Sequence, residues 1–365
     1  MDYASPFFTE LAFSLATEKL LDIEVPERAV WIRMLMSELN RISSHLLFMA
    51  TNGMDLGAVS MMIYGWRERE EVLRFFEKVT GLRMNHNYIR PGGVAADLPD
   101  GWKGEIEGLL ELLPPRLEEY DVLMTGQPIW RERLQGVGTL NTDEALALSA
   151  TGPILRSTGY AWDLRRDQPY LAYDEVDFDV IVGTYGDCYD RYAIRLNEIR
   201  ESMRIVEQIL DKMPSGDYRV QDKKVTPPPR IRIDQSMEAL IHHFKLYTEG
   251  VIVPAGETYT ATEAPKGEMA KSMGHSDARP RTPDGAGAGR RFEVLRARVL
   301  AASVKSGAPG ARRVSGARFT EKKRLPAAGH AGRFGGRLLL VGRGPGRFIH
   351  RGLGGESPVR AAAAR

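Results

Sequence analysis

Apolar side chains recur every three or four positions along much of the first 270 residues, a spacing that predicts amphipathic helices. Pro26 suits the first turn of a helix, and the Asn52-Gly53 pair predicts where that helix stops. The helices predicted from this spacing cover residues 6–22, 26–51, 59–80, 102–124, 143–150 and 189–212.

Strand signals are fewer than helix signals. The candidate strands are two short apolar runs bounded by turns, 177–182 and 251–253. The run Pro227-Pro228-Pro229 predicts an extended connector. The predicted fold class is therefore mainly α, a helical bundle with small β additions.

The charge distribution divides the chain near residue 270. The formal net charge of +2 hides 21 Lys+Arg against 5 Asp+Glu from Lys271 onward, whereas residues 1–270 carry a net charge of −14. The segment 271–365 is also rich in Arg, Gly and Ala, a composition that buries too little apolar surface to offset its ordering entropy. We predict a globular domain over 1–270 and a disordered basic tail over 271–365. Two origins remain open for this tail, a natural arm that contacts nucleic acid or anionic lipid and a shifted reading frame.

The overall composition excludes several protein classes. With 43% hydrophobic and 27% charged residues, the 365-residue chain has the averages of a globular protein. No apolar run approaches the roughly 20 residues that a membrane-spanning helix needs. The single cysteine, Cys188, excludes an intramolecular disulfide and any iron–sulfur site built from several thiolates of this chain.

The histidines do not form an obvious metal site. His45 lies on the apolar side of the predicted helix 26–51, which favours a hydrogen-bonded core histidine over a metal ligand. His242 and His243 are adjacent, so on a helix they point about 100° apart and do not share a ligand position.

A series of sequence strings carries a family resemblance. In order, they are Met1-Asp2-Tyr3, Ser37-Glu38-Leu39-Asn40-Arg41-Ile42-Ser43-Ser44-His45-Leu46, Asp55-Leu56-Gly57-Ala58, Asn87-Tyr88-Ile89-Arg90-Pro91-Gly92-Gly93-Val94, Asp190-Arg191-Tyr192 and Tyr247-Thr248-Glu249-Gly250. Their order and spacing over about residues 1–270 resemble the hydrogenase-like quinone-site subunit of respiratory complex I, the NADH:quinone oxidoreductase.

This resemblance implies a fold similar to the large subunit of nickel–iron hydrogenases, with the former metal cavity turned into the end of a quinone chamber. The sequence agrees with the loss of metal, because Cys188 alone cannot supply the thiolates that nickel and iron require. The implied role is a peripheral-arm subunit on the cytoplasmic side of the cell membrane. Quinone, either ubiquinone or menaquinone, is the implied substrate. NADH, FMN and the iron–sulfur clusters are expected on partner subunits, chiefly the neighbour that carries the terminal cluster, and no nucleic acid is expected as a partner.

The resemblance also assigns site residues. Tyr3 matches a tyrosine whose hydroxyl hydrogen-bonds the quinone carbonyl, and Asp55 matches an aspartate that pairs with a quinone-contacting histidine. Read without the resemblance, Asp55 is a turn residue after Asn52-Gly53. Four methionines are candidate chamber walls, because flexible thioethers tolerate a sliding apolar ligand, although such residues are more often core: Met54, Met61, Met62 and Met84.

Several departures from the family pattern concern the same site. The family's His-Pro-Ser-Thr-His-Gly loop, which supplies the histidine partner of Asp55, is absent, and Asn85 stands where many relatives have a histidine near the terminal cluster. Family-like sequence stops at about Met269. We therefore expect a chain shortened at its N-terminus and frameshifted at its C-terminus, whose half-open site binds quinone weakly.

Two alternatives remain at this level. One is a subunit of a membrane-bound hydrogenase or of another donor:quinone oxidoreductase, against which the single cysteine argues. The other is a nonfunctional fragment, or a basic protein that binds nucleic acid through residues 271–365 in a salt-dependent manner.

Overall fold

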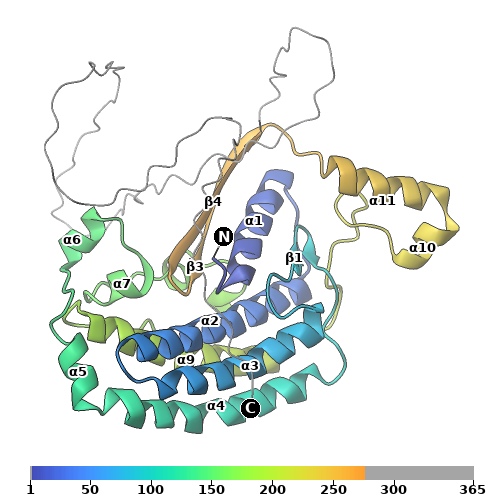
Figure 1. Cartoon of the computed structure of the whole chain (residues 1–365). Helices are drawn as coiled ribbons and strands as arrows, with labels where there is room; N and C mark the ends of the chain where they lie inside the picture. The colour runs from blue at the N-terminus through green and yellow to red at the C-terminus, as the bar shows by residue number, and fades with distance from the viewer. Residues whose placement is uncertain (1, 276–365) are drawn as a thin grey trace, which may run out of the picture. The chain divides into compact units, whose positions relative to one another are not determined.

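The computed structural model describes residues 2–275 (Figure 1). Three helices come first, α1 (Pro6–Leu21), α2 (Glu27–Asp55) and α3 (Ser60–Thr80). The stop signal at Asn52-Gly53 was wrong, since α2 runs on to Asp55. Gly53 has no left-handed backbone and instead lets Met61 approach closely, because a Cβ there would lie 2.7 Å from the Met61 Cβ. The chain turns at Gly57, where φ is +95°.

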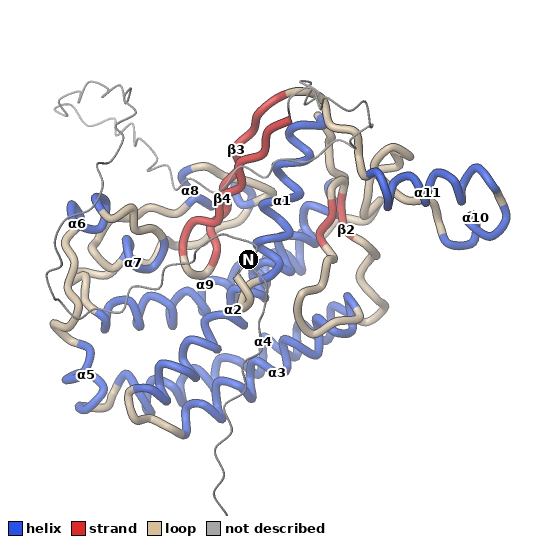
Figure 2. The backbone as a smooth tube through the Cα atoms, turned by 45° about the horizontal axis from the view of Figure 1, so that its top comes forward, coloured by secondary structure: helices blue, strands red, loops and turns tan. Residues whose placement is uncertain are grey.

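Four helices build the core. They are α2, α3, α4 (Trp102–Tyr120) and α9 (Cys188–Lys212), and they lie side by side in both ribbon views (Figures 1 and 2). A single π turn, η1 (Asp121–Thr125), ends α4. Their facing sides bury apolar residues such as Leu39, Phe76, Leu113 and Ile205, each fully inaccessible to solvent. The periodic stretches predicted over 59–80, 102–124 and 189–212 correspond to three of these helices.

Several short elements lie between η1 and α9 in the sequence. They are α5 (Pro128–Leu134), α6 (Thr142–Ala147), α7 (Gly152–Arg156), α8 (Leu164–Asp167) and the 3-10 turn η2 (Tyr173–Glu175). The helix predicted over 143–150 is α6. It begins with a reciprocal capping box, in which the Asn141 side chain accepts from the Glu144 amide and Glu144 accepts from the Asn141 amide.

The β structure consists of two antiparallel hairpins. A small one pairs β1 (Ile89–Arg90) with β2 (Gly93–Val94), and a longer one pairs β3 (Gly256–Ala264) with β4 (Gly267–His275). Helix α1 packs against the longer hairpin (Figure 1). The prediction of a mainly α fold with small β additions is confirmed.

The two predicted strands were wrong. Residues 177–182 form an extended segment beside α9, where the backbone amides of Asp177 and Asp179 donate to side chains of that helix instead of to another strand. Residues 251–253 form a connection that precedes β3. Strand β3 was not predicted because Gly256–Ala264 alternates threonines with other residues, several of them charged or aromatic, and contains no apolar run.

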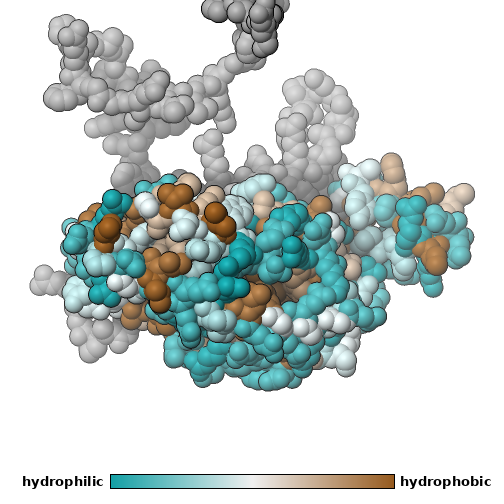
Figure 3. Space-filling view, turned by 60° about the horizontal axis from the view of Figure 1, so that its bottom comes forward, coloured by the Kyte–Doolittle hydropathy of each residue, from teal (hydrophilic) through white to brown (hydrophobic). Residues whose placement is uncertain are grey.

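Two further helices form an arm, α10 (Arg230–Gln235) and α11 (Met237–Glu249), which follows the extended Pro227-Pro228-Pro229 connector. Figure 2 shows this arm projecting from the helical layer, and neither helix contains a buried residue. Apolar side chains are visible on it in the space-filling view (Figure 3). The sequence pattern had indicated no helix at this position.

The predicted tail lies almost entirely among residues 276–365, outside the described part of the chain. β4 crosses the boundary drawn at residue 270 and ends at His275. The division of the chain at residue 270 stays a prediction.

Candidate functional site

A network of charged side chains fills the space between α2, α7, α8, α9 and β3. None of its members is more than 3% exposed: Glu38, Arg41 and His45 come from α2, Arg156 from α7, Asp163 and Arg165 from the start of α8, Glu198 from α9 and Glu263 from β3. Buried ions cost several kcal/mol each unless they are paired and hydrogen-bonded. The network is therefore stable only if its charged groups pair with one another.

Glu38 is the centre of one half of the network. Its carboxylate accepts hydrogen bonds from the hydroxyls of Tyr173 at 2.6 Å and Ser202 at 2.7 Å. It also forms ion pairs with Arg41 at 3.2 Å and Arg165 at 3.3 Å. Burial alone would raise the pKa of Glu38, but the two guanidiniums outweigh it and hold the pKa below its usual value.

Arg156 is the centre of the other half. One of its guanidinium nitrogens donates to Glu198 at 2.8 Å and another donates to Glu263 at 2.8 Å. The second oxygen of Glu198 lies 2.7 Å from Nε2 of His45. Burial would raise the pKa of Glu198, yet Arg156 and His45 bring it well below the ordinary value.

Asp163 connects the halves. Its carboxylate accepts from Arg165 at 2.8 Å and lies 3.6 Å from Arg156. Against the effect of burial, these two guanidiniums lower the pKa of Asp163 to about 2. Asp163 is therefore a permanent anion between two permanent cations.

The pKa shifts of the remaining two groups, His45 and Glu263, both favour the neutral form. Burial lowers the pKa of His45 despite its bond to Glu198, so the imidazole is neutral and donates from Nε2. Burial also raises the pKa of Glu263, although Arg156 opposes this shift. The three carboxylates whose pKa is lowered face the three guanidiniums of Arg41, Arg156 and Arg165.

The network also joins the hairpin to the helical layer, because Arg41 donates to the backbone carbonyl of Glu263 at 2.6 Å. His45 was predicted from the sequence as a core histidine, whereas Glu38 and Arg41 were used only as part of a family marker. The sequence did contain a signal for a buried polar network. Glu38, Arg41 and His45 occupy positions i, i+3 and i+7 of one helix, so they lie on one face, among apolar residues. Charges on the buried face of a long helix predict partners from other elements.

The structure places Tyr3 and Asp55 apart from this network. Tyr3 lies in the turn before α1 with its side chain 63% exposed, and Asp55 is the exposed last residue of α2. Within residues 2–275, neither side chain makes a hydrogen bond or ion pair. The carbonyl of Ala4 lies beside Asn40, 3.5 Å from its side-chain nitrogen. Asn40 is about 22 Å along the helix axis from Asp55 at 1.5 Å per residue. The shared quinone cavity stays a prediction.

The four methionines have different environments. Met61 is fully buried in the core beside Gly53, whereas Met54 is 41% exposed. The sulfur of Met62 accepts from the Trp66 indole at 3.0 Å, and the half-buried Met84 accepts from Arg69 at 3.5 Å. Met61 is therefore a core residue of this structure, and a chamber role for the four methionines stays a prediction.

The histidine predictions can be compared directly with the structure. His45 is a satisfied core residue, as predicted. His243 stacks against Tyr247 with ring centres 4.5 Å apart, and no cluster of three metal-ligating side chains occurs among residues 2–275. Asn85 is exposed, and its neighbour His86 is buried against Phe7, with ring centres 4.1 Å apart. Burial lowers the pKa of His86 to about 4.

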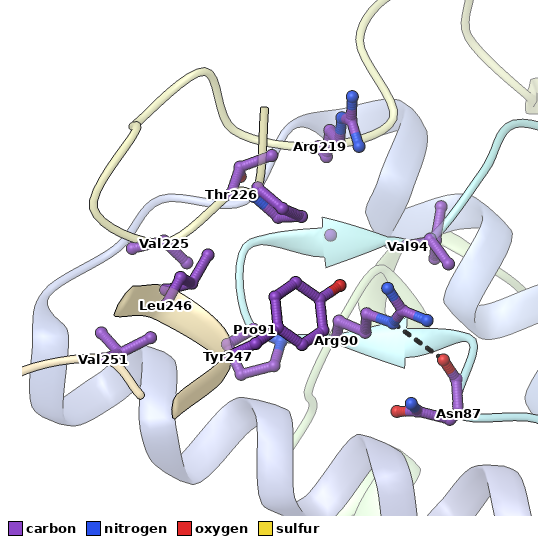
Figure 4. Close-up of a pocket in the computed structure, with 13 residues that line it drawn as sticks. Asn87, Arg90, Pro91, Val94, Arg219, Val225, Thr226, Leu246, Tyr247 and Val251 are labelled. Atoms are coloured by element: carbon purple, nitrogen blue, oxygen red, sulfur yellow. Dashed lines mark hydrogen bonds between the residues drawn. The ribbon is translucent and has the colours of Figure 1, made fainter. Parts of the chain in front are cut away.

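A cavity lies at the base of the α10–α11 arm, between the β1–β2 turn, residues 219–227 and α11 (Figure 4). Its volume is about 250 Å³, and both arginine and aliphatic side chains line it. Neither Tyr3 nor Asp55 belongs to its wall. In the part of the chain that the structure describes, no helix has both the length and the apolar character needed to cross a membrane.

Comparison with known proteins identifies related chains. The family "Respiratory-chain NADH dehydrogenase, 49 Kd subunit" matches residues 55–281. The chain is 53% identical over 287 residues to an NADH-quinone oxidoreductase subunit of Salinispora arenicola, covering 74% of this chain and 65% of the relative. It is 50% identical over 269 residues to the corresponding NADH-quinone oxidoreductase subunit of Rickettsia felis, covering 74% of this chain and 69% of the relative. The match thus spans about two thirds of the length of these relatives.

Proposed function

The chain belongs to the family of the 49-kDa subunit of respiratory-chain NADH dehydrogenase, and from this membership we propose that it is a peripheral-arm subunit of a proton-translocating NADH:quinone oxidoreductase. The observation that carries the proposal is the match over residues 55–281, together with about half of all aligned residues identical to proteins named as NADH-quinone oxidoreductase subunits. The mainly α fold agrees with the resemblance found in the sequence.

In this proposal the chain forms one wall of the quinone-reduction site. Tyr3 donates its phenolic hydrogen to a quinone carbonyl, and Asp55 orients the imidazole that contacts the other side of the headgroup. Two electrons and two protons convert the quinone to quinol, so groups that supply protons near both carbonyls favour the reaction. The exposure of both side chains within residues 2–275 supports this role, because a group that meets a ligand or a neighbouring subunit cannot be enclosed by its own chain.

The electron carriers belong to other subunits in this proposal. NADH and FMN bind elsewhere, and electrons reach the quinone through iron–sulfur clusters, the last of which lies on a neighbouring subunit. The complex would hold this chain at the cytoplasmic side of the cell membrane, beside the membrane-arm subunits. The hydrogenase alternative is disfavoured, because the relatives are named NADH-quinone oxidoreductase and Cys188 alone offers no thiolate pair.

The test replaces the corresponding subunit of a bacterial complex with this chain, extended at both ends by the segments of a relative that lie outside the match. If the proposal holds, an affinity tag on the chain recovers the other subunits and NADH oxidation by ferricyanide. Tyr3→Phe should then lower quinone reduction roughly tenfold or more, because a positioned proton donor is lost. Ferricyanide reduction should not change, since it needs only flavin and clusters.

Tyr185→Phe is the matched control, since Tyr185 is also a strongly exposed tyrosine, at 72%. It should leave both activities unchanged. Equal loss of both activities in Tyr3→Phe would show an assembly defect and contradict the assigned role. Failure of the tagged chain to recover any other subunit would contradict the proposed function itself.

A further inference from the structure

The cavity beside the α10–α11 arm has two chemically different halves. Val225, Leu246 and Val251 supply aliphatic surface on one side, and Arg90 and Arg219 border the other. Figure 4 shows Val225, Leu246 and Val251 grouped together and the two arginines in the opposite half, which also holds Val94. A cavity with this division matches a ligand that has one charged and one apolar part.

The basic half lacks a counter-ion from the described chain. Within residues 2–275, neither Arg90 nor Arg219 forms an ion pair with a carboxylate. Nε of Arg90 donates to the backbone carbonyl of Asn87 at 2.9 Å, which leaves its terminal nitrogens available. Glu10 is the carboxyl group that acts on Arg90 through space, but its oxygens already accept three backbone amides, from residues 87–89, at 2.6–3.0 Å. The positive charge at the cavity is therefore not cancelled by a direct contact.

Backbone hydrogen bonds fix the position of Arg219. The amide of Val220 donates to Gly92 at 2.8 Å, and the amide of Val94 donates to Tyr218 at 3.0 Å. This pairing brings the two segments so close that a Cβ on Gly93 would lie 2.4 Å from the Tyr218 carbonyl oxygen. The loop that carries Arg219 is thus held against the β1–β2 turn before any ligand arrives, which reduces the ordering cost of binding.

Tyr247 stands between the two halves. Its ring projects into the cavity from α11, between Arg90 on one side and Val251 on the other (Figure 4). The side chain is 62% exposed and its hydroxyl has no hydrogen-bond partner within residues 2–275. A phenol in this position can cover an alkyl chain with its ring and donate to an anionic headgroup with its hydroxyl.

We propose that this cavity binds a short-chain anionic amphiphile, with a phosphate headgroup between Arg90 and Arg219 and an alkyl chain against Val225, Leu246 and Val251. Guanidinium groups bind phosphate oxygens through charge-assisted hydrogen bonds, and two of them can hold one phosphomonoester from two directions. The volume of about 250 Å³ is small for a ligand site, which limits the enclosed part to a short chain. The proposal depends only on described residues and is independent of the role in quinone reduction.

The test titrates the purified full chain with octyl phosphate by calorimetry. Inorganic phosphate and octanol serve as probes of the headgroup and the tail alone. Octyl phosphate should bind at least about tenfold more tightly than either probe, because only it fills both halves. Binding of octyl phosphate no tighter than inorganic phosphate would overturn the proposal.

Variants locate the site. Arg90→Gln and Arg219→Gln should each weaken octyl phosphate binding about tenfold, whereas Arg219→Lys should retain most of it. Arg74→Gln is the matched control, because it removes the same charge from an exposed position on α3. Unchanged urea midpoints will show that the variants are folded. Equal weakening by Arg74→Gln would mean nonspecific attraction and would overturn the proposal.

Vesicles distinguish the two sources of such a headgroup. Phosphatidylcholine vesicles with and without phosphatidate are floated with the wild-type chain and with Arg90→Gln/Arg219→Gln. Flotation that requires both phosphatidate and the two arginines identifies a membrane lipid as the ligand. Binding of soluble octyl phosphate without flotation identifies a free amphiphile. Flotation that persists in the double variant, without octyl phosphate binding by the wild type, contradicts the site.

Discussion

Helix α2 carries polar residues into two opposite environments. Its middle holds Glu38, Arg41 and His45, which are sealed inside the protein, and its end holds Asp55, which is exposed. The first group has partners from four other elements of the chain, whereas Asp55 has none within residues 2–275. Charged residues therefore take part in the packing in the middle of this helix and stay exposed at its end.

The difference follows from the cost of burying charge. An ionised side chain inside a protein is tolerated only when counter-charges and hydrogen bonds replace the water it loses. The network meets this condition by pairing its carboxyl groups with three guanidiniums. An exposed aspartate such as Asp55 keeps its water of hydration. It therefore needs no counter-charge from its own chain.

The largest expected effect comes from removing a central member of the network. Glu198→Ala leaves Arg156 and His45 without their shared carboxylate, and breaking a buried ion pair in this way costs about 3–5 kcal/mol. The same change at the exposed site, Asp55→Ala, should cost less than about 0.5 kcal/mol. Urea unfolding of the full chain, followed by tryptophan fluorescence, measures both. Equal losses of stability at the two positions would contradict the expected difference between the buried network and the exposed end of α2.

Acid should act on the network before it acts on the rest of the fold. Folding lowers the pKa of Glu38, Glu198 and Asp163, so the unfolded chain binds more protons than the folded chain at low pH. Their contribution to stability is complete above about pH 4.5 and is lost as the pH falls toward 2. For Asp163 alone it is on the order of 2 kcal/mol.

The check is a series of urea midpoints between pH 7 and pH 3. Glu198→Gln should flatten the decline below pH 4.5, because it removes one of the carboxylates that must be protonated. An identical decline in wild type and variant would mean that acid unfolds the protein through groups outside the network.

A smaller effect is expected from deleting single hydroxyls. Tyr173 donates to Glu38 at 2.6 Å inside the network, and a buried hydrogen bond to a charged group is worth about 1.5–3 kcal/mol. Tyr173→Phe should cost that amount, whereas Tyr3→Phe should change the free energy of unfolding by less than about 0.5 kcal/mol. Thermal melts of both variants give the comparison. A marked loss of stability in Tyr3→Phe would show that its hydroxyl is part of the fold.

The same contrast explains what the sequence could predict. Helices such as α2, α3 and α9 follow from apolar spacing, because each buries one face against the others. The β3–β4 hairpin could not be recognised, since Thr258, Thr262 and Glu263 are buried by contacts with elements distant in the sequence, chiefly α1 and the network. Its fold depends on partners distant in the sequence.

The candidate site residues were chosen on different grounds from the helices. Tyr3 and Asp55 came from a resemblance, and their types alone gave no reason to choose them. The network residues Arg156, Glu198 and Glu263 lie far apart in the sequence and carry no spacing signal, so only the folded chain shows that they meet. Glu38, Arg41 and His45 did carry a spacing signal, because their polar side chains lie on the buried face of one helix.

The smallest expected effect concerns Glu263, the carboxyl group of the network whose pKa is raised. Burial raises the pKa of Glu263 above its ordinary value, so the folded chain keeps a proton that the unfolded chain releases above about pH 4.5. The wild type therefore loses stability as the pH rises from 4.5 toward the folded pKa. Glu263→Gln keeps the shape and the acceptor for Arg156 but carries no such proton. Its stability should differ from wild type by no more than about 1 kcal/mol at pH 4.5, and the difference should shift in favour of the variant as the pH rises.

His45 has the opposite pH dependence, because burial lowers its pKa and its contribution is lost below about pH 6.5. Since His45 is present in both proteins, its effect cancels when Glu263→Gln is compared with wild type at each pH. Glu257→Gln, at an exposed position of the same strand, controls for the loss of one acidic group. Urea midpoints at half-unit steps from pH 4.5 to 7 give the result. A constant difference between Glu263→Gln and wild type over this range would mean that the fold does not raise the pKa of Glu263, and would contradict the prediction.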